Sequence, residues 1–370
     1  MKNILYIGPY KENTGLGRSA RRYIDALGYN LDINLSIRPI YFTKNLDHIN
    51  ESGKDYNEFE ENYSKSYDMV IQHGYAHSFV YMYEFGENIC IPEINTYNIG
   101  HTGWTDRVNM MDTVIVPSRW VENSLKQSGC ETKMKMIPEP FDIKRYDNFE
   151  SRPIFDGQND SFVFYYIANY NEINNILALI TAFYLEFEKH DDVSLVIKTN
   201  QLGQPDLQEA QNFIKYEIQK LQKALRVKDQ NINKPHILIG NYREDYMMNL
   251  HSQADCYVNT CKCEGFGAAS IESMLFDNLT IVNQASGPNT YINRDNGFEI
   301  KSILSNIYST EYYFEYENTI YEMWREPLLN SIKQQMRKAY ETDEYVKAQK
   351  LSKFNKNIFT ADYFIEELLK

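Results

Sequence analysis

Residues 264–272 read Glu264-Gly265-Phe266-Gly267-Ala268-Ala269-Ser270-Ile271-Glu272 and follow an apolar run over residues 256–259. The run predicts a buried strand, and the residues from Ala268 onward predict a helix. The two glycines allow a tight loop whose backbone N–H groups can approach an anion, and the first turn of the helix adds its positive end. The stretch therefore predicts a strand, a glycine loop and a helix that together bind a phosphate group.

Two glutamates lie on either side of this loop. Glu264 is at its mouth, and Glu272 lies about one turn into the helix, roughly 6 Å along the axis from Ala268. A carboxylate beside a diphosphate repels it, so both side chains make sense as acceptors of hydrogen bonds from hydroxyl groups, such as those of a sugar and a ribose. The spacing therefore suggests a nucleotide sugar. The alternative for Glu272 is an exposed helix glutamate without a ligand.

Strands alternate with helices on both sides of this stretch, which is typical of a mostly parallel sheet. We expect strands over residues 3–8, 33–37, 68–72, 97–100, 113–116, 162–167, 193–198, 236–239, 256–259 and 280–283, and helices over residues 18–27, 118–127, 175–189, 207–225, 245–254 and 268–276. A polar stretch over residues 148–160 interrupts the alternation. The fold class is therefore α/β, with two doubly wound domains over residues 1–150 and 151–355.

Two such domains are expected to bind ligands in a cleft at the carboxyl ends of their strands. The apolar spacing over residues 360–369 predicts a last helix, and we expect residues from about 356 to 370 to pack back onto the first domain. The length of 370 residues suits two cores of ordinary size.

Composition and charge limit the classes of binding partner and the cellular compartment that we expect for this protein. Lys+Arg 38 against Asp+Glu 51 gives a net charge of -13, which disfavours nucleic acid and anionic lipid as partners. No run approaches the roughly 18 apolar residues of a membrane span, and the first ten residues do not read as a signal peptide. The odd number of cysteines, 5, does not suggest a disulfide framework. We therefore expect a cytoplasmic protein whose contact with a membrane is at most peripheral.

These residues resemble the retaining glycosyltransferases of family 4, which have the GT-B fold of two Rossmann-like domains facing each other across a cleft. The E-x7-E signature of that family matches Glu264 and Glu272. Further landmarks follow in the family's order: Val116-Pro117-Ser118, Ile137-Pro138-Glu139-Pro140-Phe141-Asp142, Ser286-Gly287-Pro288 and Asn296-Gly297-Phe298. The resemblance covers most of the chain and is strongest from about Ile99 to Ile300.

The resemblance implies an enzyme that moves a hexose-type sugar from a nucleoside diphosphate to an acceptor hydroxyl of a glycan, a protein or another glycoconjugate. The first domain would hold the acceptor. Glu264 would contact the hydroxyls of the donor sugar and Glu272 those of the ribose, while the backbone of Gly265, Phe266 and Gly267 would line the pocket. His101 falls where the family often places a histidine near the donor sugar, and a purely structural histidine is the equal alternative.

The sequence departs from the family in the loop that usually neutralises the diphosphate. The family usually carries an Arg and a Lys in the loop after the first strand of the second domain, but Asn169–Asn175 contains no basic residue. Stabilising the leaving group is often the largest catalytic term, so a substitute is needed for full activity. The candidates are Lys198, Arg243 and Lys262, and Lys198 comes first because strand ends face the cleft. Each could equally be a solvated surface cation.

In the first domain, Gly15, Gly17 and Arg18 are candidates to close over the phosphates or the acceptor. A tight turn without a ligand is the equal alternative.

The sequence predicts no metal and no cofactor beyond the donor substrate. It contains no Asp-x-Asp pair of the kind that holds a divalent cation on a diphosphate, and Cys261 and Cys263 form a single C-x-C without a second pair. Two alternative functions stay open. One is a non-catalytic nucleotide-sugar-binding or interaction protein of the same fold, which the missing basic pair motivates, and the other is a nucleotide-sugar epimerase or hydrolase. The oligomeric state is left open.

Overall fold

The computed structural model describes residues 1–42, 55–100, 102–154, 161–200, 207–227, 232–307 and 323–370. The chain divides into two compact units. Unit 1 comprises Met1–Lys144, Asn306–Met323 and Lys356–Lys370, and unit 2 comprises Arg145–Ser305 and Trp324–Asn355. The division at Lys144 comes shortly before the polar stretch that begins at Asn148.

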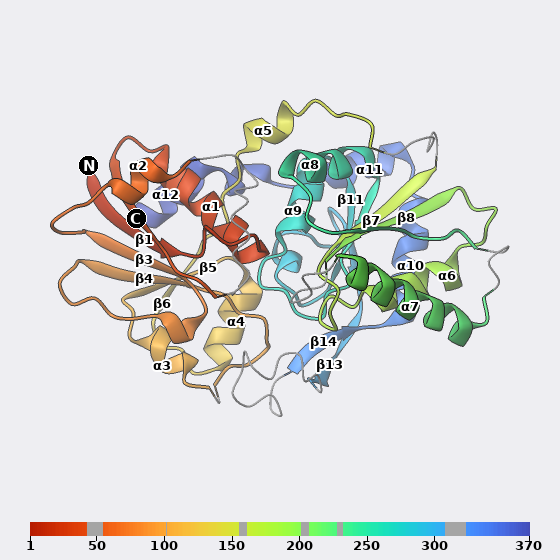
Figure 1. Cartoon of the computed structure of the whole chain (residues 1–370), viewed down its shortest axis with the longest axis horizontal. Coiled ribbons are helices and arrows are strands. Elements are labelled where there is room, and N and C mark those ends of the chain that lie inside the picture. The colour runs from red at the N-terminus through yellow and green to blue at the C-terminus, as the bar shows by residue number, and fades with distance from the viewer. Residues whose placement is uncertain (43–54, 101, 155–160, 201–206, 228–231, 308–322) are drawn as a thin grey trace. The chain divides into compact units, whose positions relative to one another are not determined.

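Among the described residues, unit 1 contains a parallel sheet of six strands in the order β2-β1-β3-β4-β5-β6. The strands are β1 (Lys2–Gly8), β2 (Ile33–Pro39), β3 (Met69–Gly74), β4 (Glu87–Pro92), β5 (Thr113–Val116) and β6 (Lys133–Met136). The helices that belong to this unit or end at its boundary are α1 (Gly15–Gly28), α2 (Asn57–Glu61), α3 (Trp104–Asn109), α4 (Arg119–Gln127), α5 (Ile143–Asp147) and α12 (Ala361–Leu369), with short 3-10 helices over Ala76–Ser78 and Lys356–Phe359. Helices α1 and α12 cover one face of the sheet, and α3 and α4 cover the other (Figure 1).

The described part of unit 2 also contains a parallel sheet of six strands, in the order β12-β11-β10-β7-β8-β9. Its strands are β7 (Phe162–Ile167), β8 (Val193–Thr199), β9 (His236–Ile239), β10 (Cys256–Val258), β11 (Leu279–Asn283) and β12 (Phe298–Ile300), and β13 (Ser302–Asn306) and β14 (Met323–Pro327) form a separate pair. Its helices are α6 (Ile176–Glu186), α7 (Leu207–Leu225), α8 (Glu244–Gln253), α9 (Ala268–Leu275), α10 (Leu329–Tyr340) and α11 (Glu344–Leu351), with a 3-10 helix over Pro288–Thr290. Helices α8 and α9 lie on one face, and α6, α7 and α10 lie on the other (Figure 1).

The strand order indicates where a ligand would bind at the edge of each sheet. In unit 2 the order reverses between β7 and β10, as in dinucleotide-binding domains, and in unit 1 it reverses between β1 and β3. Open parallel sheets bind ligands outside the carboxyl ends of the strands at such a reversal. In unit 2 that position lies between the loop after β7 and the loop after β10.

One predicted strand is wrong. Residues 97–100 form no strand, and the fourth strand of the sheet is Glu87–Pro92, which the sequence analysis missed. The Asn98 side chain accepts a hydrogen bond from the Gly100 backbone N–H at 2.7 Å, and the Ile99 N–H donates to Ser128 Oγ at 2.8 Å. These two backbone N–H groups are bonded to side chains, so they cannot form the hydrogen bonds that a strand would need.

The last helix packs within unit 1. The Thr360 hydroxyl caps α12 by accepting from the Tyr363 N–H at 3.2 Å, and the buried side chains of Phe364, Ile365 and Leu368 join the core formed with α1. The rings of Tyr23 and Phe364 lie 5.2 Å apart. Burying such apolar side chains stabilises a fold by about 1.5–3 kcal/mol each, so α12 is a structural part of unit 1.

A buried histidine makes the stability of unit 1 depend on pH. His73, at the end of β3, lies 2.6 Å from the Tyr6 hydroxyl through its Nδ1, and burial lowers the pKa of His73 from 6.5 to about 3. The folded chain therefore keeps His73 neutral at pH values where the unfolded chain binds a proton. The stabilisation is complete above pH 6.5 and is lost as the pH falls from 6.5 toward 3, by about 1.4 kcal/mol per pH unit.

We therefore expect the free energy of unfolding to fall by about 2 kcal/mol more in the wild type than in His73→Asn between pH 7 and pH 5. Asparagine keeps an acceptor for the Tyr6 hydroxyl but does not titrate. Urea titrations at the two pH values measure the difference, and equal pH slopes for the two proteins would contradict the assignment.

Candidate functional site

The loop after β10 requires glycine at its last position. Gly267 has a left-handed backbone, with φ 80° and ψ 55°, and directly precedes α9. A Cβ atom on Gly267 would lie 2.2 Å from Pro288 Cγ and 3.1 Å from Glu264 Oε2. The tight turn brings the start of α9 next to Glu264, so backbone N–H groups and a carboxylate lie at one place.

A second glycine holds the loop from the other side. The Gly287 N–H donates to the Glu264 carbonyl at 2.8 Å, and a Cβ on Gly287 would lie 2.1 Å from the Gly265 carbonyl oxygen. The turn after β11 therefore packs directly on the backbone of the glycine loop. This contact fixes the path of the chain between the two glutamates.

Asn259, which directly follows β10, orients the first glutamate. Its Nδ2 donates to Glu264 Oε2 at 2.5 Å and to Ser270 Oγ at 3.0 Å, and its Oδ1 accepts from the Cys261 N–H at 2.9 Å. Asn259 is buried, and its amide holds the loop, the carboxylate and α9 together. This residue was not predicted from the sequence, although a polar side chain at the carboxyl end of a buried strand was the signal.

The second glutamate has two partners from other elements. Tyr146 donates its hydroxyl hydrogen to Glu272 Oε1 at 3.1 Å, and His251 Nε2 lies 3.6 Å from Glu272 Oε2. The Glu272 side chain is 16% exposed, so it is held at the surface of the unit. This placement does not fit the alternative of a solvated helix glutamate. Neither Tyr146 nor His251 was predicted.

Two buried tyrosines have pKa values to which the charges of these glutamates contribute. Burial raises the pKa of Tyr257 well above its usual value, and the charges of Glu264 and Glu272 both add to the rise. Tyr165, whose ring lies 5.1 Å from that of Tyr257, has a pKa that burial raises in the same way, with a contribution from Glu272. Both glutamate charges therefore act on Tyr257, and the charge of Glu272 also acts on Tyr165.

The loop after β7 lies beside this glycine loop. The Lys262 N–H donates to the Ile173 carbonyl at 2.8 Å, and the Thr260 hydroxyl donates to the Asn174 carbonyl at 3.2 Å. Within the loop, Asn174 Nδ2 donates to the Asn169 carbonyl at 2.9 Å, and Asn175 has a left-handed backbone with φ 56° where α6 begins. The two loops thus meet at the reversal of the strand order.

The three candidate cations differ in their surroundings. Lys262 is buried against carboxylates, with Nζ 2.7 Å from Glu326 Oε2 and 3.4 Å from Glu172 Oε1. The Arg243 side chain is 80% exposed and pairs with Asp245. Lys198 is buried at the end of β8, and its carbonyl accepts from the Ala168 N–H at 3.1 Å, next to the loop after β7. Lys198 and Lys262 are therefore both buried beside the loop after β7, whereas Arg243 lies at the surface.

The predicted residues of unit 1 form a separate group. The Thr14 hydroxyl caps α1 by accepting from the Gly17 N–H at 3.0 Å, and a Cβ on Gly17 would lie 2.1 Å from the Glu12 carbonyl oxygen. This close approach is enough to explain why residue 17 is a glycine, and no bound ligand is needed for the explanation. Gly15 begins α1 and Arg18 lies in its first turn, half-buried. His101 lies outside the described residues.

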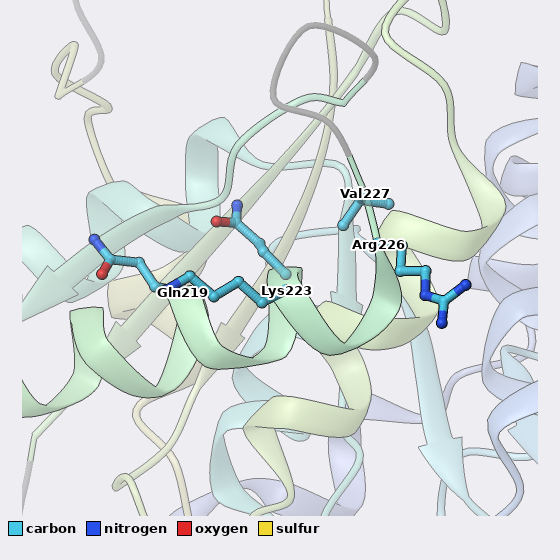
Figure 2. Close-up of a pocket in the computed structure, with 5 residues that line it drawn as sticks. Gln219, Lys223, Arg226 and Val227 are labelled. Atoms are coloured by element: carbon cyan, nitrogen blue, oxygen red, sulfur yellow. The ribbon is translucent and has the colours of Figure 1, made fainter.

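A surface pocket of about 340 Å³ lies elsewhere on unit 2. Figure 2 shows Gln219 and Lys223 along α7, with Arg226 and Val227 just beyond its end. None of its lining residues belongs to the predicted site.

Two kinds of feature are absent from the part of the chain that the structure describes. No group of three or more His, Cys, Asp or Glu side chains in this part of the chain is placed to hold a metal ion. No described helix has the length and apolar character needed to cross a membrane.

Residues 147–303 match the model of the protein family described as Glycosyl transferases group 1. This range contains both glutamates, the glycine loop and the loop after β7. No curated protein sequence matches the chain.

Several solved structures resemble the whole chain. Anabaena Alr3699/HepE, in complex with UDP-glucose, is 13% identical, with a TM-score of 0.61, and the match covers 100% of this chain and 99% of that one. A glycosyltransferase from Rickettsia africae ESF-5 is 14% identical, with a TM-score of 0.61 and coverages of 100% and 97%. The N-terminal domain of Candida albicans trehalose-6-phosphate phosphatase is 10% identical, with a TM-score of 0.65 and coverages of 100% and 97%. Together with the two parallel sheets, these likenesses confirm the predicted α/β fold class, a GT-B fold.

Proposed function

We propose that this chain, a glycosyltransferase with the GT-B fold, moves a sugar from a nucleoside-diphosphate sugar to an acceptor hydroxyl, with retention of configuration and without a metal. One observation carries the proposal. Glu264 and Glu272 flank the glycine loop that begins α9, at the reversal of strand order in unit 2. A site with phosphate-binding backbone between two hydroxyl-binding carboxylates suits a nucleotide sugar.

Each part of the donor has a matching group in unit 2. The N–H groups at the start of α9 and the backbone of Gly265–Gly267 would bind the diphosphate. Glu264, oriented by Asn259, would accept hydrogen bonds from the sugar hydroxyls, and Glu272 would accept them from the ribose. The Anabaena protein was solved with UDP-glucose, which supports this class of donor.

The reaction needs few protein groups. An acceptor hydroxyl would attack the anomeric carbon from the face that the diphosphate leaves. The bond from that carbon to the phosphate oxygen breaks, the bond to the acceptor oxygen forms, and the leaving phosphate takes the acceptor's proton. We assign Lys198 to stabilise the departing diphosphate, because it is buried at the carboxyl end of β8, beside the loop after β7. Unit 1 would hold the acceptor.

A second function has one observation in its favour. The loop Asn169–Asn175 carries no cation, and Lys262 is already paired with two carboxylates. A protein that binds a nucleotide sugar without transferring it would need no further charge at the leaving group. Donor binding without turnover over a wide screen of acceptors would favour this function.

A thermal-shift panel tests the proposed function. UDP-, GDP-, ADP- and dTDP-sugars are compared with and without chelator, on the wild type, on Glu272→Gln and on Glu188→Gln as an exposed control. A ligand at 100 times its Kd adds about 2.7 kcal/mol, so one donor is expected to raise the melting temperature by several degrees. The shift should persist with chelator, persist in the control and disappear in Glu272→Gln. No shift with any donor would contradict the proposal, and free sugar or isomerised donor without acceptor would indicate a hydrolase or an epimerase.

A further inference from the structure

We propose that unit 1 binds its acceptor through a cluster of aromatic rings at the carboxyl end of its sheet, and that the acceptor is a glycan that presents a pyranose ring. The aromatic cluster consists of four neighbouring rings, those of Phe42, Tyr75, His77 and Trp104. This proposal rests on the proposed function, because it names the class of acceptor for the transfer. No sequence motif identified these residues.

The four side chains come from separate segments that meet at the carboxyl ends of the strands. Phe42 lies three residues beyond the end of β2, Tyr75 directly follows β3, His77 lies in the short helix that comes next, and Trp104 begins α3. The strand order of unit 1 reverses between β1 and β3, and open parallel sheets bind ligands at the carboxyl ends of the strands at such a reversal. The aromatic cluster therefore lies where the topology of unit 1 predicts a ligand.

The rings pack in one continuous group. The Tyr75 and His77 rings are nearly parallel, with centroids 6.1 Å apart and an interplanar angle of 11°. The Phe42 ring meets Tyr75 edge-on at 5.0 Å and His77 edge-on at 6.0 Å. The Trp104 ring lies 5.9 Å from Tyr75 and 5.7 Å from His77. These contacts restrict the motion of each ring, so that little binding free energy is spent on ordering the group when a ligand binds.

The aromatic cluster reaches the protein surface. His77 is exposed, Phe42 and Tyr75 are half-buried, and Trp104 is 7% exposed. Aromatic side chains stabilise a fold through the area that they bury, so a cluster that served stability alone would gain from burying all four rings. The exposed part of the group is therefore a surface to which a ligand has access.

Two features of the neighbouring loops place Phe42 in this group. Gly74, the last residue of β3, has a φ of 149°, and a Cβ there would lie 2.5 Å from Phe42 Cε2 and Cζ. The Phe42 N–H donates to the carboxylate of Glu12, which is 2% exposed and also accepts from the Thr14 hydroxyl at 3.3 Å. Burying a carboxylate is costly unless it accepts hydrogen bonds. The position of the Phe42 ring is thus fixed by both the loop after β1 and the end of β3.

The chemistry of the cluster suits a pyranose ring. The face of an aromatic ring is negative, and the C–H groups on one face of a pyranose carry a small positive charge, so the two faces attract. Burial and the charge of Arg107 lower the pKa of His77 from its usual 6.5, so the imidazole is neutral at pH 7. A neutral imidazole offers one N–H donor and one acceptor nitrogen to hydroxyl groups. An alkyl chain on the same rings would cover these nitrogens without bonding to them.

Saturation-transfer difference NMR on the full chain tests the proposal. The probes are the methyl glycosides of β-glucopyranose, β-galactopyranose, α-mannopyranose and β-N-acetylglucosamine, each alone and with UDP, GDP, ADP or dTDP. Sorbitol is the control ligand, because it has the hydroxyls of a hexose but no ring face. We expect at least one glycoside to bind, with the strongest saturation at the C–H protons of one ring face, and sorbitol not to bind. Binding of sorbitol as tight as that of the glycosides would overturn the proposal.

Substitutions at His77 separate ring stacking from other effects, and they do so at an exposed position where the fold tolerates change. His77→Ala is expected to raise the Kd of the bound glycoside about five- to tenfold, whereas His77→Phe, which keeps a ring, should stay within about twofold. Phe42→Leu, which keeps the bulk without the ring, should raise the Kd as His77→Ala does. The control is His190→Ala, whose side chain is 78% exposed and belongs to unit 2. Wild-type affinity in both His77→Ala and Phe42→Leu would overturn the proposal.

Donor binding, measured with the thermal-shift panel, distinguishes this proposal from the proposed function. A chain that binds a donor but none of the glycosides would overturn the acceptor site alone. A chain that binds a glycoside through the aromatic cluster but no donor would contradict the proposed function and support the cluster as a sugar-binding site. Loss of nucleotide binding in His77→Ala would assign the cluster to the nucleotide and overturn its role for the acceptor.

Discussion

Replacing either Glu264 or Glu272 with glutamine is expected to lower kcat/KM for sugar transfer by at least about 100-fold, with little change in the melting temperature. Each glutamate is placed by neighbouring donors, Asn259 for Glu264 and Tyr146 for Glu272. A glutamine keeps the size of the side chain but presents one acceptor oxygen in place of two and adds a donor that faces the ligand. The loss of charge-assisted hydrogen bonds to bound hydroxyls costs about 1.5–3 kcal/mol each, and two such bonds account for the expected factor.

The two variants should differ in what they bind. Glu272→Gln should weaken both the free nucleoside diphosphate and the donor, whereas Glu264→Gln should weaken only the donor, because the sugar is absent from the free nucleotide. Steady-state kinetics and calorimetry with both ligands measure this difference. Glu188→Gln is the matched control in the same unit, since its side chain is 77% exposed and lies outside the site. Wild-type kinetics in both glutamate variants would refute the assignment of the site.

Gly267→Ala is expected to lower the free energy of unfolding by roughly 2–4 kcal/mol and to abolish donor binding. The φ of 80° disfavours any residue with a Cβ, and the added atom would lie 2.2 Å from Pro288 Cγ. Pro288 belongs to the segment that packs on the glycine loop through Gly287. Relief of the clash must therefore displace either this segment or the start of α9.

Thermal unfolding and the thermal-shift panel together check this prediction. The melting temperature should fall by on the order of 5–10 °C. Gly103→Ala is the control, because Gly103 has a φ of −72° and a Cβ there would meet nothing within 4 Å. A Gly267→Ala protein as stable as the control, with donor binding intact, would show that the turn tolerates a side chain.

Local signals in the sequence predicted most of the elements. The Ser118 cap of α4 is confirmed, since its hydroxyl accepts from the Val121 N–H at 3.2 Å, and the helix predicted over residues 207–225 is α7. The strand predicted over residues 97–100 is wrong because the side chains of Asn98 and Ser128 hydrogen-bond that backbone instead. The periodicity of apolar residues cannot reveal that a side chain competes for these backbone N–H groups, because one of the competing side chains, Ser128, is distant in the chain.

In the candidate site, too, local sequence signals identified some residues, and contacts between distant parts of the chain identified others. Glu264 and Glu272 could be named from the sequence because their loop has a local pattern of glycines and carboxylates. The residues that hydrogen-bond to them, Asn259 and Tyr146, carry no such pattern, and Tyr146 is distant in the chain from the glutamate that it contacts. Their roles follow from hydrogen bonds across elements.

Sequence alone was enough to predict the alternation of strands and helices, the GT-B fold class, the glycosyltransferase class and the glycine loop between two carboxylates. Each of these depends on the spacing of apolar residues, glycines and charges within a short segment, which local backbone preferences and burial suffice to translate into structure. Other properties became visible only in the folded chain. They are the polar groups that orient the carboxylates, the pairing of Lys262 with Glu326, the burial of Lys198, and the close packing that accounts for Gly17. Those properties depend on distances between residues far apart in the chain, and a one-dimensional pattern contains no such distances.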